Sequence, residues 1–428
     1  MLDSSGVRQL AYLVRVDAIE QIQGSDNCEA AIVGGWRVMV RKGTFKPNDI
    51  AIYFEIDSKV DTNRPEFAFL ASKNGKIKTQ RYTFGGKGLM ISQGLLMHPN
   101  DFGWITAVSP AEPDMPYVLT EPNNPVNSKS LHLTNDSRFL TSMLGVTYSA
   151  EEDNVRKAPT VDKYKKMASS HPKVFKMKLV RWMIRYEFGK KILFRLFGKK
   201  EDTTGNGWPV GKFHGVSKTD QERCENMPWV LKDKTPFIVT QKCDGSSGTY
   251  ILERIKKNKF EFYVCSRNVR MMKPDQECFY KEKNYYWEVA TKYDIENKMR
   301  DYLNKNPDIS FVCWQGEICA PGIQKNPHHL TETHFYAFHM TDSKTGRFDI
   351  RDAAKIWDEY GIETVPIVDT NYTMPDDFEE FKKTADGKYD PSVCEGNPNC
   401  AREGFVYYKT TVPTFSFKNV SREYLLNH

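Results

Sequence analysis

Long apolar runs are missing from the sequence. None of the 428 residues lies in an apolar stretch that approaches the roughly 20 residues of a membrane-spanning helix. The opening "MLDSSGVRQLAYLVRVDAIE" also lacks the basic segment followed by an apolar core that marks a secretory signal. We therefore expect no membrane partner and a location inside the cell, in the cytoplasm or the nucleus.

Cysteines at regular spacing are missing as well. The nine cysteines are an odd number, and they are scattered through apparent strands rather than placed as in a disulfide framework. This pattern indicates a reducing compartment with most cysteines in the core. The segment "CEGNPNC", from Cys394 to Cys400, has no accompanying Cys or His pair at zinc-finger spacing, which argues against a structural zinc.

Repeats, low-complexity tracts and a strong excess of one charge are also absent. The formal charge of +6 is mild, so the distribution of the charges matters more than their sum. The length predicts two or three domains. Residues 1–110 contain short alternating segments separated by Gly, Asn and Pro, which predict a small β-barrel or sandwich. Basic residues between these strands form either a phosphate-contacting edge or a solvated loop; they include Lys76, Lys78 and Arg81.

Residues 111–204 differ in composition, and we interpret them as a linker or insert. Within them, the segment 171–200 has apolar residues at helical spacing and basic residues mostly off that face, which predicts a basic amphipathic helix. Such a helix lies on a membrane, grips nucleic acid or packs on a neighbouring domain, and its apolar stripe favours packing. Residues 205–428 return to strands with helices between them. The whole chain is therefore predicted to be α+β, with antiparallel sheets and flanking helices in the second domain.

The segment "FIVTQKCDGSSGTYIL" places a lysine and an aspartate between two apolar, β-branched runs. Lys-x-Asp-Gly alone is weak, because roughly one chain in ten of this length contains it by chance. Its context is specific, since "KCDG" resembles motif I of the covalent nucleotidyltransferases, and further motifs follow in that superfamily's order. They are "CSRN", "WQGEICAPGIQKN", "HFYAFHM", "REGFVYYK" and "FSFKNV", which resemble motifs Ia, III, IIIa, IV and V.

The resemblance is closest to ATP-dependent RNA ligases, which share the preceding segment "SKTDQERCENMP". It includes the N-terminal half, where "GGWRVMVRKGTFKPNDIAIYFEID" and "ISQGLL" resemble the OB-fold module of the family-five RNA ligases. Only ten residues follow Lys418, so the further domain with motif VI of DNA ligases and capping enzymes is not expected. Two alternatives stay open: a ligase that prefers DNA strands, and a non-ligating RNA-binding protein that retains the fold.

The resemblance implies a role for each motif residue. Lys242 would attack ATP and carry AMP, and it is joined in the implied catalytic set by Asp244, Glu317, Glu403 and Lys418. Further implied nucleotide contacts are Gly245, Arg267 and Phe338, the last stacking on adenine with Phe335 or Tyr336 as fallback. Asp244, Glu317 and Glu403 would hold Mg²⁺ or Mn²⁺ through water, as hard oxygen ligands do. Gln324 and Asn326 are candidate RNA contacts.

The chemistry makes its own demand on Lys242. At a reference pKa of about 10.4, fewer than about one lysine in a thousand is neutral at pH 7, and only the neutral amine attacks. We expect a monomeric enzyme whose partner is RNA, nicked or end-paired, with a 5′-phosphate and a 3′-hydroxyl. Two positions depart from the family pattern: Ser416 stands where many relatives have a first motif V lysine, and His339 follows Phe338 where Asp is common.

Overall fold

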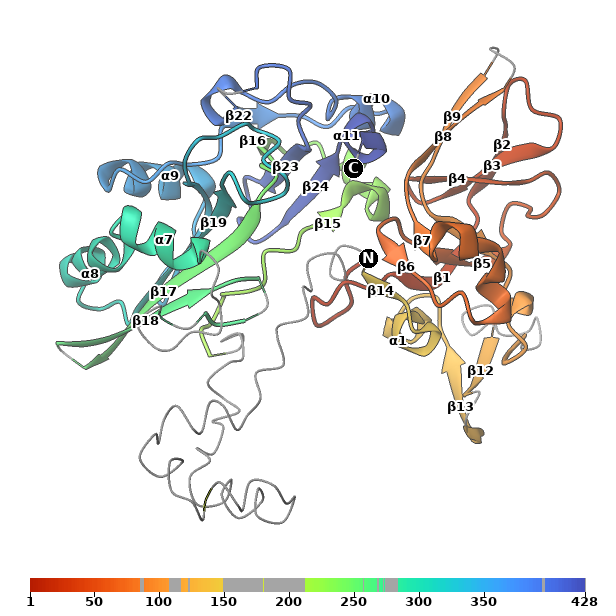
Figure 1. The fold of residues 1–428 in the computed structure, drawn as a ribbon, viewed down its shortest axis with the longest axis horizontal. Coiled ribbons are helices and arrows are strands. Elements are labelled where there is room, and N and C mark those ends of the chain that lie inside the picture. Colours follow the sequence, from red (N-terminus) through yellow and green to blue (C-terminus); the bar gives the residue numbers. More distant parts are fainter. Residues whose placement is uncertain are drawn as a thin grey trace.

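Short antiparallel sheets make up most of the protein, and helices flank the sheets of its C-terminal half (Figure 1). This computed structural model describes residues 1–84, 88–107, 117–121, 124–148, 180, 212–256, 258–267, 269–271, 273, 284–394 and 397–427. The predicted α+β class is confirmed. The basic helix predicted over 171–200 lies outside the described residues apart from Val180, and so do the predicted domain borders near 110 and 204.

The N-terminal module is a set of small sheets around a shared apolar interior. One sheet joins β1 (Ala11–Arg15), β5 (Ile50–Phe54) and β10 (Leu95–Met97), and another joins β2 (Ala18–Gln21), β3 (Cys28–Val33) and β4 (Trp36–Arg41). A hairpin is formed by β8 (Gln80–Phe84) and β9 (Gly88–Ser92). Alternate side chains of these strands point inward, and the largest buried ones include Tyr12, Trp36 and Tyr53.

Part of the segment that we assigned to the insert packs onto this module. β14 (Thr147–Tyr148) pairs with β6 (Ser58–Lys59), which also pairs with β7 (Lys76–Ile77). A short helix, α1 (Thr141–Leu144), lies next to β1 because the Thr141 hydroxyl accepts a 2.8 Å hydrogen bond from the amide of Leu10. A further sheet joins β11 (Ile105–Ala107), β12 (Tyr117–Glu121) and β13 (Asn124–Leu131). The N-terminal module therefore includes residues up to 148.

The C-terminal module contains two five-stranded sheets. The first has the order β15 (Glu222–Arg223), β24 (Ser416–Val420), β23 (Gly404–Lys409), β16 (Phe237–Gln241) and β22 (Ile367–Tyr372). The second has the order β18 (Lys259–Cys265), β17 (Ser246–Lys256), β19 (Phe311–Cys319), β20 (His334–Asp342) and β21 (Gly346–Arg347). The strands at the centre of each sheet are the most apolar, as strands covered on both faces should be.

Five helices of the C-terminal module are described. They are α7 (Tyr285–Lys292), α8 (Ile295–Lys305), α9 (Ile350–Glu359), α10 (Phe378–Lys383) and α11 (Arg422–Asn427). Helix α9 starts where the side chain of Asp349 accepts a hydrogen bond from the amide of Arg351, an N-cap that satisfies an end donor. Its buried Trp357 joins Trp314 of β19 in one core, so the helix covers one face of the second sheet.

The two modules meet at a buried carboxylate. Glu55 of the N-terminal module accepts hydrogen bonds from Arg8 (3.0 Å), from the hydroxyl of Tyr12 (2.9 Å) and from the amide of Asn226 (2.9 Å), and also from the N-terminal ammonium. Burial alone would raise the pKa of Glu55, but the N-terminal ammonium and Arg8 hold it below its usual range. Because Asn226 precedes β16, this contact ties the N-terminal module to the chain that leads into motif I.

The turn between β3 and β4 makes a second contact between the modules. A Cβ atom on Gly35 would lie 2.7 Å from the backbone of Glu225 and 2.2 Å from the ring of Phe378. Only glycine leaves this space, and the Gly35 amide donates a 2.6 Å hydrogen bond to the carbonyl of Glu225. The Gly34–Gly35 turn thus lets the C-terminal module approach closely.

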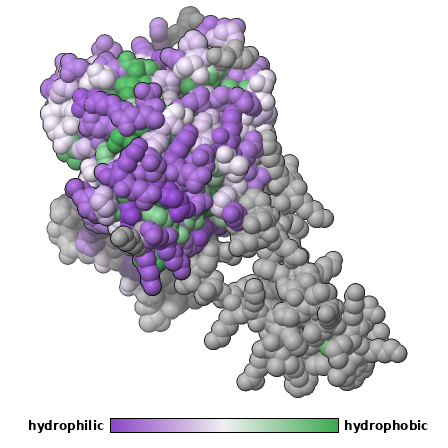
Figure 2. Space-filling model, turned by 90° about the vertical axis from the view of Figure 1, so that its left-hand side faces the viewer, coloured by the Kyte–Doolittle hydropathy of each residue, from purple (hydrophilic) through white to green (hydrophobic). Residues whose placement is uncertain are grey.

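Membrane contact was not expected from the sequence. No helix within the described part of the chain is long and apolar enough to cross a bilayer. On the face that Figure 2 shows, hydrophilic residues cover most of the coloured surface and hydrophobic residues form small separate areas.

Candidate active site

Lys242 lies where two strands of the first sheet meet. It directly follows β16, and its amide donates a 3.0 Å hydrogen bond to the carbonyl of Gly404, the first residue of β23. Because β16 and β23 are antiparallel, the end of one strand is next to the start of the other. Glu403 therefore stands beside the lysine, and its Oε2 accepts a 2.8 Å hydrogen bond from Lys242 Nζ.

The Lys242 amine is surrounded by carboxylates. Burial alone would lower its pKa, but Glu403 and Glu317, together with Asp244, outweigh burial and hold the pKa above its usual value. In this arrangement the amine carries its proton. The arrangement therefore stores the nucleophile as an ammonium ion, and a change of charge at the carboxylates is needed to free it.

Glu317 comes from the second sheet. It lies on β19, where it pairs with Ser247 of β17 and Tyr336 of β20. Burial, with smaller contributions from Glu403 and Asp244, raises the pKa of Glu317 to about 8 despite the opposing charge of Lys242. A carboxyl that is costly to ionise beside two other carboxylates suits a divalent cation, because a cation offsets both burial and like-charge repulsion.

Gly245 explains how the motif I loop reaches β19. A Cβ atom at this position would lie 2.4 Å from the carbonyl oxygen of Ile318 and 2.9 Å from both Cys319 Sγ and Glu317 Cγ. The glycine of motif I is therefore required for the close approach of the motif I loop to β19. This close approach brings Glu317 into the same site as Lys242.

Asp244 is held by the C-terminal helix. Its Oδ2 accepts a 2.7 Å hydrogen bond from the hydroxyl of Tyr424 on α11, and both side chains are more than nine-tenths buried. Our sequence analysis did not select Tyr424. No motif contains it, and only the position of α11 beside the motif I loop reveals the contact.

Lys418 marks a basic side of the site. It lies on β24, directly opposite Arg223 in the parallel pairing with β15, so both side chains project from the same face. Burial, followed by the positive charges of Arg223 and Arg8, lowers the pKa of Lys418 to about 7. Asp220 opposes this effect and also forms an ion pair with Arg267.

Arg223 is a second residue that our sequence analysis missed. Its side chain is buried at 5% exposure, and one guanidinium nitrogen bonds to Asp57 of the N-terminal module at 3.1 Å. The other two nitrogens, Nε and Nη1, have no hydrogen-bond partner among the described residues. Burying unpaired donors costs free energy unless a ligand satisfies them. The segment "QERCEN" contains this arginine, but the sequence alone did not place it beside Lys418.

The aromatic candidates on β20 separate by face. Phe335 is fully buried in the core under α9, with Ala337 and Met340. Tyr336 and the partly buried Phe338 belong instead to the cluster around Cys243, the residue after the nucleophile. Phe335 therefore cannot reach the Lys242 side of the sheet, whereas Phe338 lies on it.

His339 is buried beside Phe338, with the two ring centroids 4.9 Å apart. Burial, followed by the charge of Arg347, lowers the pKa of His339 well below its usual value, so the ring is neutral. Neither ring nitrogen has a hydrogen-bond partner within the described residues. The interpretation of His339 as a neutral substitute for Asp agrees with its charge, but no hydrogen bond supports it.

The candidate RNA contacts are placed in different regions. Gln324 reaches the site, since its Nε2 donates a 3.3 Å hydrogen bond to the carbonyl of Gly245. Asn326 makes two hydrogen bonds to the backbone of Leu330, so its side chain stabilises its own loop. The N-terminal candidates Lys76, Lys78 and Arg81 lie at β7 and β8, separate from the motif I cluster.

The structure thus brings Lys242, Asp244, Glu317 and Glu403 together and places Lys418 to one side with Arg223. Among the described residues, no group of three or more His, Cys, Asp or Glu side chains is positioned to hold a metal ion directly. The three carboxylates around Lys242 supply only hard oxygen atoms. This donor set fits Mg²⁺ or Mn²⁺ held through water molecules, because both ions prefer oxygen ligands. It fits zinc less well.

Comparison with known families gives a match for each module. Residues 235–420 match the family model described as RNA ligase. Residues 10–98 match the model of an OB-fold domain, which confirms the predicted N-terminal OB-fold module.

Solved structures share the fold over almost the whole chain. An RNA ligase of Naegleria gruberi with pyrophosphate is 23% identical, with a TM-score of 0.64, and the match covers 99% of each chain. A variant of that enzyme with ATP and Mn gives 23% identity, a TM-score of 0.63 and 99% coverage of each chain. A variant with AMP and Mn gives 23% identity and a TM-score of 0.64, with 98% of this chain covered and 99% of the other. No curated protein sequence matches this chain significantly.

Proposed function

We propose that this protein is an ATP-dependent RNA ligase that joins a 3′-hydroxyl to a 5′-phosphate in three steps, through a lysyl-AMP on Lys242. One observation carries the proposal: the Lys242 amine lies 2.8 Å from Glu403, close to two further carboxylates, at the edge of a site whose other side is cationic. The Naegleria enzymes of the same fold were solved with ATP, AMP, pyrophosphate and Mn, which supports these ligands here.

In the first step the neutral Lys242 amine attacks the α-phosphorus of ATP. A bond forms between Nζ and phosphorus, the bond to the β-phosphate oxygen breaks, and pyrophosphate leaves with the electron pair. The AMP is then transferred to the oxygen of an RNA 5′-phosphate, and Lys242 is restored. Finally the RNA 3′-hydroxyl attacks that 5′-phosphate, and AMP leaves.

Cationic and acidic residues of the site have different roles in this reaction. Lys418 and Arg223 attract the triphosphate. Arg223 supplies the second positive charge, because Ser416 stands where many relatives have the first lysine of motif V. Phe338 stacks on adenine from the face of β20 that carries Cys243. Asp244, Glu317 and Glu403 would hold a divalent cation through water, and that cation would neutralise charge on the triphosphate and the carboxylates. As the charge on Glu403 is offset, the attraction that keeps Lys242 protonated weakens.

Incubation with α-labelled ATP or GTP and magnesium, followed by denaturing electrophoresis, tests the first step. We expect an acid-labile label from ATP on the wild-type chain and none on Lys242→Ala. Absence of label would contradict the mechanism and favour a non-ligating RNA-binding protein, and equal label on the variant would contradict the role of Lys242 as the nucleophile. Competition between nicked RNA and nicked DNA duplexes for one adenylated enzyme then separates an RNA ligase from one that prefers DNA.

A further inference from the structure

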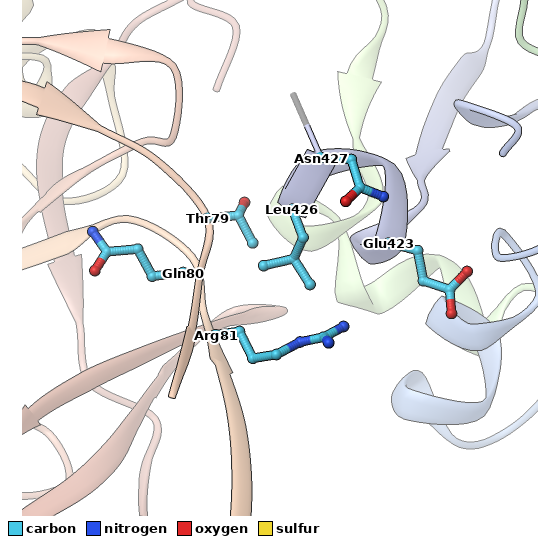
Figure 3. Close-up of a pocket in the computed structure, with 6 residues that line it drawn as sticks. All are labelled: Thr79, Gln80, Arg81, Glu423, Leu426 and Asn427. Atoms are coloured by element: carbon cyan, nitrogen blue, oxygen red, sulfur yellow. The ribbon is translucent and has the colours of Figure 1, made fainter. Parts of the chain in front are cut away.

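A polar cleft separates the hairpin strand β8 of the OB module from the C-terminal helix α11 of the ligase domain. Its volume is about 620 Å³, and it is lined by Thr79, Gln80, Arg81, Glu423, Leu426 and Asn427. Arg81 extends from β8 toward α11, and Leu426 reaches from α11 toward β8 (Figure 3). Both modules therefore build the cleft.

The wall formed by α11 is held in place. Arg422, the first residue of α11, makes a bidentate ion pair with Glu379, and its Nε lies 3.4 Å from the Gln93 side chain of the OB module. Helix α11 is thus fastened to both modules. The cleft has two anchored walls, as a binding site for an extended strand requires.

Positive charge gathers on the β8 wall. Arg81 is exposed and lines the cleft. Lys73 lies at the same edge, with its Nζ 3.1 Å from Gln80 Oε1, and Lys76 and Lys78 precede the strand. Glu423 is the single acidic side chain among the six that line the cleft. A polyanion is therefore the ligand that this wall favours.

Helix α11 lines the cleft and also contacts the nucleophile loop. Glu423 and Asn427 are exposed on α11 and are four residues apart, so they share a face. Tyr424, on the same helix, is buried and donates a hydrogen bond to Asp244, two residues after Lys242. A strand in the cleft would therefore lie against the helix that also holds the motif I loop.

We propose that this cleft binds the sugar-phosphate backbone of the RNA substrate next to the joint that the enzyme seals, with Arg81 contacting a phosphate. The inference rests on the proposed function, because an RNA ligase must hold its polyanionic substrate beside the lysyl-AMP. It assigns to the β8 and α11 surfaces a shared role that neither module fulfils alone.

The test measures the affinity of the full chain for a fluorescent nicked RNA duplex by anisotropy, over a series of salt concentrations. Arg81→Ala should weaken binding about fivefold, as the loss of one charged contact predicts. It should also reduce the slope of log affinity against log salt by about 0.9, the value for one duplex phosphate. Arg351→Ala is the matched control, because Arg351 is an exposed arginine on α9, at the far end of the ligase domain (Figure 1).

Two variants on α11 test the sign of the effect. Glu423→Gln removes a negative charge and should tighten RNA binding about twofold, whereas Asn427→Asp adds one and should weaken binding about twofold. A folding defect cannot tighten binding, so the opposite signs separate the cleft from general damage. Unchanged affinity in all three cleft variants, or an equal loss in Arg351→Ala, would overturn the proposal. Wild-type self-adenylation, measured in parallel, reports on the proposed function alone.

Discussion

The hydroxyl of Tyr424 donates a 2.7 Å hydrogen bond to Oδ2 of Asp244, although 180 residues separate them in the sequence. Both side chains are buried, so this hydrogen bond is protected from water. Through this hydrogen bond, the C-terminal helix holds the motif I carboxylate in position. Tyr424 is therefore a positioning residue for a site that it does not itself enter.

Tyr424→Phe should slow self-adenylation of Lys242 about tenfold or more, because a hydrogen bond to a charged group is worth about 1.5–3 kcal/mol. The rate constant at saturating ATP should fall more than the affinity for ATP, since Asp244 lies at the nucleophile. Tyr360→Phe is the control: its hydroxyl also bonds to an aspartate, Asp301 at 2.9 Å, but on the surface. Equal behaviour of the two variants in quench-flow adenylation would show that Asp244 needs no such support.

Protonation of Lys418 should control ATP affinity. Its pKa is about 7 because burial and neighbouring cations disfavour the charged form. The triphosphate binds the protonated amine, so affinity should fall as pH rises through 7, by about tenfold between pH 7 and 8.5. Calorimetric titration of ATP into Lys242→Ala, which cannot react, measures binding alone. Lys418→Met in the same background should bind weakly with a flatter pH profile; a profile as steep as that of its parent would assign the titration to another group.

Much of the fold and part of the site could be predicted from the sequence because they depend on local patterns. The sheets are built from strands in which apolar and polar residues alternate and which end at Gly, Asn or Pro. The motif I loop follows such a strand, so Lys242 was predicted at the edge of a sheet. The OB-fold module and the ligase-type domain were predicted from the resemblance of the motif segments to RNA ligases, and the matches to the two family models agree with that prediction. Roles of individual site residues remain predictions, which the experiments above address.

The rest depends on pairing over long sequence distances. Arg223 stands beside Lys418 only because a two-residue strand pairs in parallel with β24, and two residues carry too little periodicity to predict a register. Tyr424 could not be predicted either, because its contact with Asp244 joins residues that are 180 positions apart in the sequence. Phe338 was one of three aromatic candidates because a shift of one residue reverses the faces of a strand, and β20 has an irregularity opposite Gln315 and Gly316. Burial then removes Phe335.

A prediction about Arg223 distinguishes a role in binding ATP from a role in the contact between the two modules. Its Nε and Nη1 have no hydrogen-bond partner among the described residues, while Nη2 bonds to Asp57 of the OB module. Lys418 is its partner in the strand pairing. If Arg223 binds the triphosphate, Arg223→Ala should weaken ATP binding about tenfold or more. Asp57→Asn breaks the same ion pair but keeps the guanidinium, so it should leave ATP affinity nearly unchanged.

Thermal melts of both variants show how much of each effect is structural. Arg223→Ala also removes a cation from the face of Trp36, 5.9 Å from the ring centroid, so some loss of stability is expected. A second readout therefore decides the outcome: removing the positive charge of Arg223 should raise the pKa of Lys418, because that charge helps to lower it. The pH at which residual ATP binding declines should then move upward in Arg223→Ala. If Asp57→Asn loses as much ATP affinity as Arg223→Ala, the arginine acts through the contact between the modules and does not bind the triphosphate.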